Sequence, residues 1–134
     1  MCGILGVSPP IHELDFVKGL DRIQHRGPDG FGVWYDEEMM LGHRRLAIID
    51  LSENGKQPMK RDHLHITYNG EIYNFLEIRE ELKILGHNFY SDSDTEVILA
   101  SLHHAKSLEG FTSDRKGKIA FISEANTNLF FEKE

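Results

Sequence analysis

Short apolar runs and one helical repeat follow each other at the start of the chain. Residues 3–7 are a mostly apolar run that predicts a buried strand, and two consecutive prolines soon end it. Over residues 14–23 apolar side chains recur at helical spacing, which predicts a helix of about three turns. The segment 25–30 carries two glycines and a proline and predicts a loop. Aromatic and branched residues at 31–35 then predict a second strand.

The middle of the chain continues with a second apolar run at residues 46–51. The segment 50–59 contains serine, asparagine, glycine and proline and predicts another loop. Residues 63–68 alternate between polar and apolar positions, which predicts a strand. The dipeptide Asn69-Gly70 is expected to end that strand sharply.

Two helices are predicted in the next segment, each from a capping pattern. Asn74 is followed three residues later by Glu77, which resembles a capping box, and Gly86 is a natural C-terminal stop. Ser93 and Glu96 repeat the same pattern. The apolar positions of the two helices are Phe75, Ile78, Leu82 and Leu85, then Val97, Ile98, Leu99 and Leu102.

The pattern weakens toward the C-terminal end of the sequence. Residues 118–122 and 128–131 read as two strands joined around residues 125–127. Strands and helices therefore segregate in runs, which favours an α+β fold with antiparallel sheets.

Composition adds limits on size, compartment and partners. The 134 residues are 40% hydrophobic and 28% charged, an ordinary composition for one globular domain. The net charge of −7 would repel a phosphate backbone, so we expect no nucleic-acid partner. A lone cysteine forms no internal disulfide, which favours a reducing compartment. No apolar stretch is long enough for a membrane span or a signal peptide, so we expect a cytoplasmic protein without membrane contact.

The position of that cysteine is the first chemical indication. Removal of Met1 would give Cys2 both a thiol and a free α-amine. An α-amino group is partly unprotonated near neutral pH, so it can take the thiol proton and the nucleophile would carry its own base. Gly3 keeps bulk away from the sulfur. The alternative is that Cys2 is a small apolar residue at the start of a strand.

Further segments decide between these interpretations. Residues 1–7, 25–30, 41–50, 68–74 and 93–99 read MCGILGV, HRGPDG, LGHRRLAIID, YNGEIYN and SDTEVIL. In this order they resemble the class II glutamine amidotransferases and, among these, the asparagine synthetase group. Several ordered motifs are far more specific than a single signature.

The resemblance is close over residues 1–105 and weak over 106–134. It implies an N-terminal nucleophile hydrolase fold, a four-layer αββα sandwich with two antiparallel sheets, incomplete at its C-terminal end. Residues 1–134 are then one glutamine amidotransferase domain, and the ATP-dependent synthetase domain of such enzymes is absent. We expect no cofactor in this domain, since ATP and magnesium would belong to the synthetase domain.

The resemblance also assigns the reacting groups. Cys2 resembles the nucleophile that attacks the side-chain amide of glutamine, giving a glutamyl thioester and ammonia. Asn69 and the backbone amide of Gly70 resemble the oxyanion hole, where two fixed donors meet the negative oxygen of the tetrahedral intermediate. Taken alone, Asn69-Gly70 is equally typical of a hairpin turn.

The same resemblance assigns the substrate-binding groups. Arg45 would hold the glutamine carboxylate, and Asp94 and Glu71 would receive its ammonium group. Arg26 and Gly27 would form the wall near the nucleophile. Alone, each charged residue is typical of a solvated surface, and Arg44 is interpreted in that way.

Eight histidines invite a metal interpretation, which we do not adopt. His63 with His65 and His103 with His104 match no usual zinc spacing, and no cysteine joins them. We expect no metal site.

Two function classes remain open. The first is an enzyme that hydrolyses glutamine and delivers ammonia to an acylated acceptor, aspartate by default or a sugar, peptide or antibiotic precursor. Its partner would be a synthetase domain in the same chain or in a second one, and a homodimer is possible. The second is a non-catalytic remnant or partner-binding module that keeps a glutamine pocket.

Overall fold

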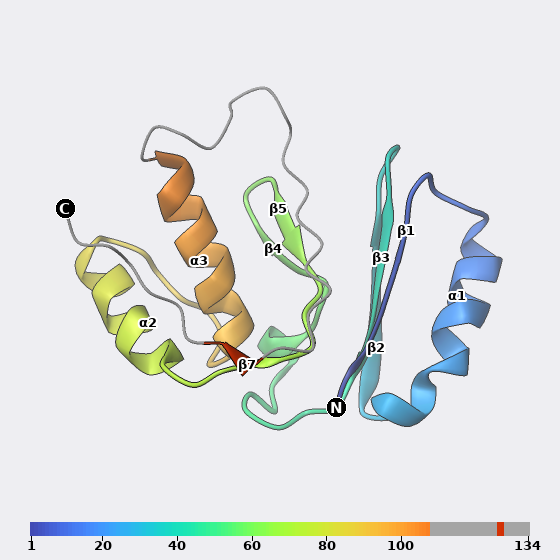
Figure 1. Cartoon of the computed structure of the whole chain (residues 1–134), viewed down its shortest axis with the longest axis horizontal. Helices are drawn as coiled ribbons and strands as arrows, with labels where there is room; N and C mark the ends of the chain where they lie inside the picture. The colour runs from blue at the N-terminus through green and yellow to red at the C-terminus, as the bar shows by residue number, and fades with distance from the viewer. Residues whose placement is uncertain (108–125, 128–134) are drawn as a thin grey trace.

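A computed structural model describes residues 1–107 and 126–127 of the chain (Figure 1). Within them the elements follow in the order β1 (Gly3–Val7), α1 (Glu13–Arg22), the short 3-10 helix η1 (Gln24–Arg26), β2 (Gly30–Tyr35), β3 (Met40–Arg45), the 3-10 helix η2 (Glu53–Gly55), β4 (Met59–Arg61), β5 (Leu64–Ile66), β6 (Glu71–Ile72), α2 (Phe75–Ile84), α3 (Asp94–Ser107) and β7 (Asn126–Thr127). The α+β class is thus confirmed.

The first sheet has the order β1-β3-β2 with antiparallel neighbours, and α1 covers one of its faces. Phe16 and Leu20 of α1 are completely buried. They pack on Gly42 of β3, where an added Cβ would lie 2.9 Å from the Phe16 ring. A larger residue at 42 would therefore push the helix away from the sheet. The predicted strand at 3–7 and the helix that follows it are confirmed, but the strand is only partly buried, since Gly3 is its one buried residue.

A second layer is formed by the antiparallel hairpin β4-β5, which α3 covers, with α2 packed on α3. Alternating apolar side chains of the hairpin and the inner faces of both helices build the main core. Its buried members are Met59, Leu64, Ile66, Tyr68, Ile72, Ile78, Leu82, Val97, Ile98, Leu99 and Ala100.

The two antiparallel sheets lie against each other between α1 on one side and α3 with α2 on the other (Figure 1). Trp34 of β2 stacks on His65 of β5 with ring centroids 3.9 Å apart. His43 of β3 shares a hydrogen bond of 2.9 Å with Thr67, which follows β5. The interior between the sheets is therefore partly polar.

The two capping predictions have different outcomes. Ser93 Oγ accepts from the Thr95 amide at 3.1 Å and caps α3. Glu96, however, does not complete a box with Ser93, because its carboxylate accepts from the main chain of Tyr90 and Ser91. The capping box at α2 is also wrong, since the Asn74 side chain makes no capping hydrogen bond.

The apolar run at 46–51 has neither helical nor strand structure and directly follows β3, a strand that was not predicted. One local interpretation is wrong. Arg44 is not a surface charge, because it is buried, donates from Nε to the Leu20 carbonyl at 3.1 Å and forms an ion pair with Asp21.

The end of the sequence departs from the predicted pattern as well. Asn126–Thr127, expected in the connection between two strands, forms β7, which pairs in parallel with β6. This pair is the exception to the expected antiparallel pairing. The strands predicted at 118–122 and 128–131 lie outside the described residues. In the described part of the chain, no helix is long and apolar enough to cross a membrane.

Candidate active site

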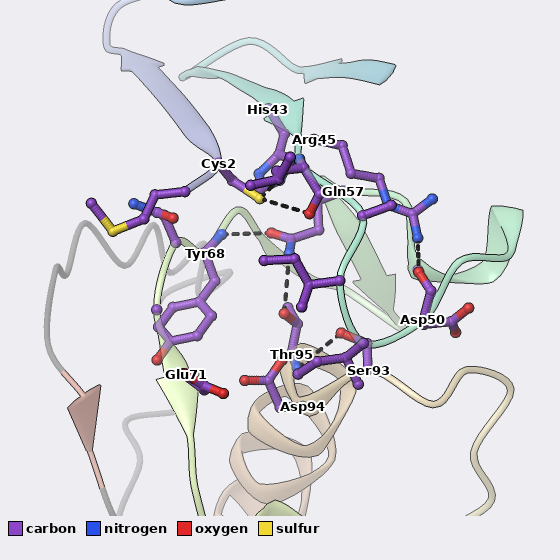
Figure 2. Close-up of a pocket in the computed structure, with 18 residues that line it drawn as sticks. Cys2, His43, Arg45, Asp50, Gln57, Tyr68, Glu71, Ser93, Asp94 and Thr95 are labelled. Carbon is purple, nitrogen blue, oxygen red and sulfur yellow. Dashed lines mark hydrogen bonds between the residues drawn. The ribbon is translucent and has the colours of Figure 1, made fainter. Parts of the chain in front are cut away.

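A cavity of about 230 Å³ opens where the two sheets meet the N-terminal end of α3 (Figure 2). Its walls come from the start of β1, the end of β3 with the segment after it, the segment that follows β5, and the first turn of α3. The residues that line it are Met1, Cys2, His43, Arg45, Leu46, Ala47, Ile48, Ile49, Asp50, Gly55, Gln57, Tyr68, Asn69, Gly70, Glu71, Ser93, Asp94 and Thr95.

Cys2 is half-buried at the edge of this cavity, directly before β1. The Leu46 amide donates to its Sγ at 3.3 Å, and the thiol lies 3.6 Å from the Leu46 carbonyl oxygen. These contacts hold the sulfur against the end of β3. Met1 also lines the cavity, and its peptide bond occupies the Cys2 nitrogen.

Arg26 and Gly27 are not among the lining residues and lie behind the nucleophile candidate. Arg26 Nε donates to the Cys2 carbonyl oxygen at 3.1 Å. Gly27 is buried, and a Cβ added there would lie 2.3 Å from the main-chain oxygen of Arg44. Arg26 therefore holds the main chain at Cys2, and Gly27 allows close packing on the end of β3.

Asn69 and Gly70 lie on the same cavity, in the segment that follows β5. Asn69 is buried. Gly70 passes directly over the side chain of Tyr68, where an added Cβ would lie 2.3 Å from the Tyr68 hydroxyl oxygen. Glycine at 70 thus lets the main chain fold closely over that ring and bring its amide to the cavity.

Arg45 provides a positive charge at one side of the cavity. Its side chain leaves the end of β3 and is almost fully buried. The guanidinium donates to the Ser52 carbonyl at 2.8 Å and to the Asp50 carbonyl. Because a guanidinium has five donors, it can hold this loop and still offer N–H groups to a carboxylate.

Two carboxylates lie across the cavity, and Figure 2 shows Arg45 and Glu71 on opposite sides of it. Asp94 is only 5% exposed, and its Oδ2 accepts from the Ile72 amide at 3.0 Å. Burial, with a smaller contribution from the charge of Glu71, raises the pKa of Asp94 above its ordinary value. A cation placed beside these two carboxylates would stabilise both charges.

Tyr68 separates the acidic side from the nucleophile. Burial, followed by the charges of Asp94 and Glu71, raises the pKa of its phenol to about 12. The hydroxyl is therefore protonated and neutral near pH 7, and it cannot serve as a base there.

Several polar residues of the lining were not predicted as site residues, among them His43, Gln57, Ser93 and Thr95. His43 is buried, and burial together with the positive charge of Arg45 lowers its pKa to about 4. Gln57 bridges the Tyr68 amide and the Thr95 hydroxyl. The sequence motif at 41–50 assigned no role to His43. Gln57 lies in the segment 50–59, for which only a loop was predicted. Ser93 and Thr95 were known from the sequence only as positions at the start of a helix.

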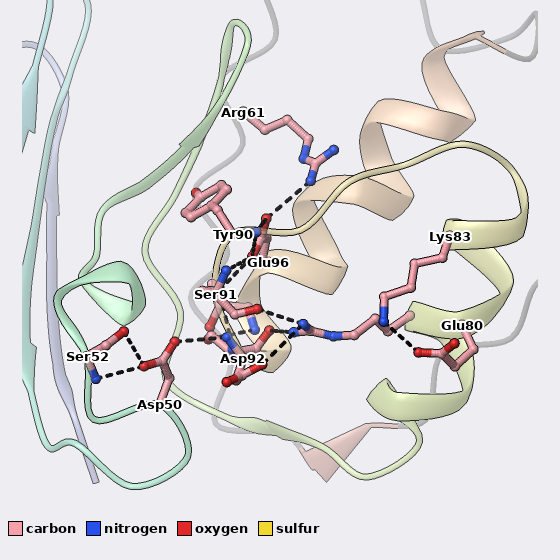
Figure 3. Close-up of polar contacts among 12 residues, drawn as sticks. Asp50, Ser52, Arg61, Glu80, Lys83, Tyr90, Ser91, Asp92 and Glu96 are labelled. Carbon is pink, nitrogen blue, oxygen red and sulfur yellow. Dashed lines mark hydrogen bonds and ion pairs between the residues drawn. The ribbon is translucent and has the colours of Figure 1, made fainter.

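A network of buried charges fixes the segment that leads into α3 (Figure 3). Glu96 is fully buried and accepts from the Ser91 amide at 2.8 Å, while Arg61 lies 3.2 Å from its Oε1. Arg79 donates to the carbonyls of Ser91 and Ser93 at 2.6 and 3.0 Å. The position of Asp94 is thus set by the core of the second layer.

The cavity brings together Cys2, Arg45, Asn69, Gly70, Glu71 and Asp94, all of them named from the sequence. A nucleophile, hydrogen-bond donors, one cation and two carboxylates around a small cavity suit a zwitterionic amino acid with a reactive side chain. Among the residues that the structure describes, no group of histidine, cysteine or carboxylate side chains could hold a metal ion.

Comparisons with known proteins show which family this sequence resembles. The family model described as a glutamine amidotransferase domain matches residues 1–132. Asparagine synthetase (glutamine-hydrolyzing) 1 of Bacillus subtilis is 44% identical over 131 residues, which are 91% of this chain and 20% of that relative. Asparagine synthetase (glutamine-hydrolyzing) 3 of the same organism is 42% identical over 147 residues, 98% of this chain and 22% of the relative.

A relative with another name also matches. Amidase chry2 of Gibberella zeae is 37% identical over 120 residues, 84% of this chain and 16% of that protein. The chain spans about a fifth of the length of the curated relatives that it matches.

Proposed function

This chain belongs to the glutamine amidotransferase domain family, and from that membership we propose that it hydrolyses the side-chain amide of glutamine and delivers the ammonia to an acceptor site elsewhere. The observation that carries the proposal is the convergence of Cys2, the Asn69-Gly70 donors, Arg45 and the carboxylate pair on one cavity. Each group matches one part of the substrate or of its transition state.

Substrate binding follows from the two charged sides of the cavity. The α-carboxylate of glutamine contacts Arg45, and the α-ammonium group contacts Asp94 and Glu71. The side-chain amide then extends toward Cys2. Binding the charged end in this way holds the amide carbon at the sulfur, which converts attack into an effectively intramolecular step.

The reaction proceeds through a thioester. After removal of Met1, the Cys2 α-amine takes the thiol proton, the sulfur bonds to the amide carbon, and the carbonyl oxygen becomes negative. Asn69 and the Gly70 amide donate to that oxygen. The α-ammonium group of Cys2 then gives its proton to the amide nitrogen. As the carbonyl re-forms, the C–N bond breaks and ammonia leaves. Water, deprotonated by the same amine, attacks the thioester, the C–S bond breaks, and glutamate leaves as the thiol is restored.

The fold and the wider assembly belong to the same proposal. We assign residues 1–134 to one N-terminal nucleophile hydrolase domain with four αββα layers, supported by the two facing sheets between α1 and α3 with α2. We place it in the cytoplasm, without a cofactor of its own. Its partner is a synthetase domain, in the same chain or a second one, that holds ATP and magnesium. The names of the relatives support aspartate as acceptor, while the amidase leaves room for another.

The test combines ammonia release from glutamine with mass spectrometry of the N-terminus. We expect ammonia and glutamate in equal amounts from protein that begins at Cys2, and none from Cys2→Ala. Full activity in protein that retains Met1 would refute the mechanism, because its peptide bond removes the base.

The second candidate is a non-catalytic module that keeps a glutamine pocket. It predicts glutamine binding by calorimetry without ammonia release, even after Met1 has been removed.

A further inference from the structure

Gln57 connects parts of the site that come from distant positions in the sequence. It lies between η2 and β4, is half-buried, and lines the cavity. The Tyr68 amide donates to its Oε1 at 2.6 Å, and its Nε2 donates to Thr95 Oγ1 at 3.0 Å (Figure 2). Because a backbone amide can only donate, the contact to Tyr68 fixes which end of the carboxamide carries the oxygen.

The main chain of Gln57 packs against the first sheet. A Cβ added at Gly32 of β2 would lie 2.1 Å from the Gln57 carbonyl oxygen, so the first sheet packs directly on this peptide. The residue therefore has a fixed backbone at the first sheet and a side chain that reaches two other elements.

Both elements carry groups of the proposed reaction. Tyr68 directly precedes the donors at Asn69 and Gly70, and Thr95 directly follows Asp94. The Gln57 carboxamide thus hydrogen-bonds to the segment after β5 that would hold the oxyanion. It also hydrogen-bonds to the first turn of α3, which would hold the ammonium group.

We propose that Gln57 is a positioning residue that sets the oxyanion donors of Asn69 and Gly70 relative to Asp94. The inference rests on the proposed function. Gln57 acts through the Tyr68 amide, so its removal affects the transition state, in which the oxygen is negative, more than the bound ground state. Displacing such donors by a fraction of an ångström lowers the rate strongly.

The kinetic test compares Gln57→Leu with two other variants. We expect Gln57→Leu to lower kcat by about 30- to 100-fold while KM changes less than about threefold, since loss of one oxyanion donor costs about 100-fold or more. Gln57→Glu should recover most of kcat, because a carboxylate still accepts from the Tyr68 amide and the Thr95 hydroxyl can turn to donate. The control is Gln24→Leu, a change at an exposed residue whose carbonyl, not its side chain, holds η1.

A second measurement does not depend on activity. Amide hydrogen exchange at Tyr68, Asn69 and Gly70 should be at least about tenfold faster in Gln57→Leu than in the parent, and unchanged in Gln24→Leu. If exchange changes but the parent releases no ammonia, the proposed function fails while the positioning role stands.

Other outcomes overturn the inference. Unchanged exchange at all three amides would show that Gln57 does not fix this segment. A raised KM with unchanged kcat would show instead that Gln57 binds the substrate. Equal loss of kcat in Gln57→Leu and Gln57→Glu would exclude the shared acceptor contact as the cause.

Discussion

Acidification from pH 7 to pH 5 tests how His43 is built into the wall of the cavity. Its ring is 1% exposed and hydrogen-bonds through Nδ1 to Thr67 Oγ1. Thr67 Oγ1 lies 3.3 Å from the Gly42 carbonyl oxygen, to which it donates. The hydroxyl proton is then used, so His43 Nδ1 carries a proton and donates to Thr67. The folded chain has room for the neutral ring, and protonation of its other nitrogen adds a buried charge near Arg45.

The size of the effect follows from the two pKa values. The pKa of His43 is 6.5 in the absence of a perturbation and about 4 in the folded chain, because of burial and then Arg45. Between these values the unfolded chain binds the extra proton, so the free energy of unfolding rises with pH. The contribution is complete above pH 6.5 and is lost progressively as pH falls from 6.5 to about 4. At about 1.36 kcal/mol per pH unit, lowering the pH from 6.5 to 5 removes about 2 kcal/mol.

The assay is urea unfolding at pH 7 and pH 5 on the parent, His43→Asn and His63→Asn. Asparagine at 43 places an amide N–H near the position of Nδ1 and can still donate to Thr67, but it does not titrate. We expect the parent to lose about 2 kcal/mol more than His43→Asn between the two pH values. His63 is exposed between β4 and β5, so His63→Asn should behave as the parent.

Equal losses in the parent and His43→Asn would refute the reasoning. In that case the folded chain would accept the proton at 43 as readily as the unfolded chain does. Because each difference is taken within one variant, a lower stability of His43→Asn at pH 7 does not affect the comparison.

The remaining predictions concern the site and its supports. Cys2→Ala should lower ammonia release at least about a thousandfold while calorimetry still detects glutamine. Arg45→Ala should weaken glutamine binding about 10- to 100-fold, as expected for loss of a charged hydrogen bond, and equal affinity would contradict its role. Gly27→Ala should lower stability by about 1–3 kcal/mol, since its Cβ would lie 2.3 Å from a main-chain oxygen, whereas Gly6→Ala, at 3.8 Å from its nearest neighbour, should be tolerated in thermal melts. Glu96→Ala should cost about 1–3 kcal/mol in urea unfolding, because it leaves the buried Ser91 amide without its acceptor and the partly buried Arg61 without its carboxylate.

The elements that sequence predicts well are those in which local signals and tertiary packing agree. The apolar run at 3–7 and the helical spacing after it describe β1 and α1, because Phe16 and Leu20 bury the side that the spacing indicates. Ser93 caps α3 through a contact two residues away, which is local and therefore visible in the sequence.

The predictions that failed have a common physical cause. Buried polar side chains find hydrogen-bond partners in distant parts of the chain, which a local pattern does not show. β3 contains His43, Arg44 and Arg45 and does not look like a buried strand, yet all three are buried with partners. The apolar run that follows β3 has no regular structure, and residues 46–50 line the cavity. Glu96 has the spacing of a capping box, but packing directs its carboxylate to the preceding loop.

That these residues lie on one cavity could be expected, because their motifs resemble a known family, but the hydrogen bonds that connect them could not be predicted. Asp50 shows the difference. Its main-chain oxygen accepts from Arg45, and its Oδ2 accepts from the Asp92 amide at 2.9 Å, two residues before Asp94. The cationic side of the cavity is therefore joined to the acidic side through one residue. If the cavity binds an amino acid as proposed, this connection through Asp50 would fix the distance between the groups that contact its two charges.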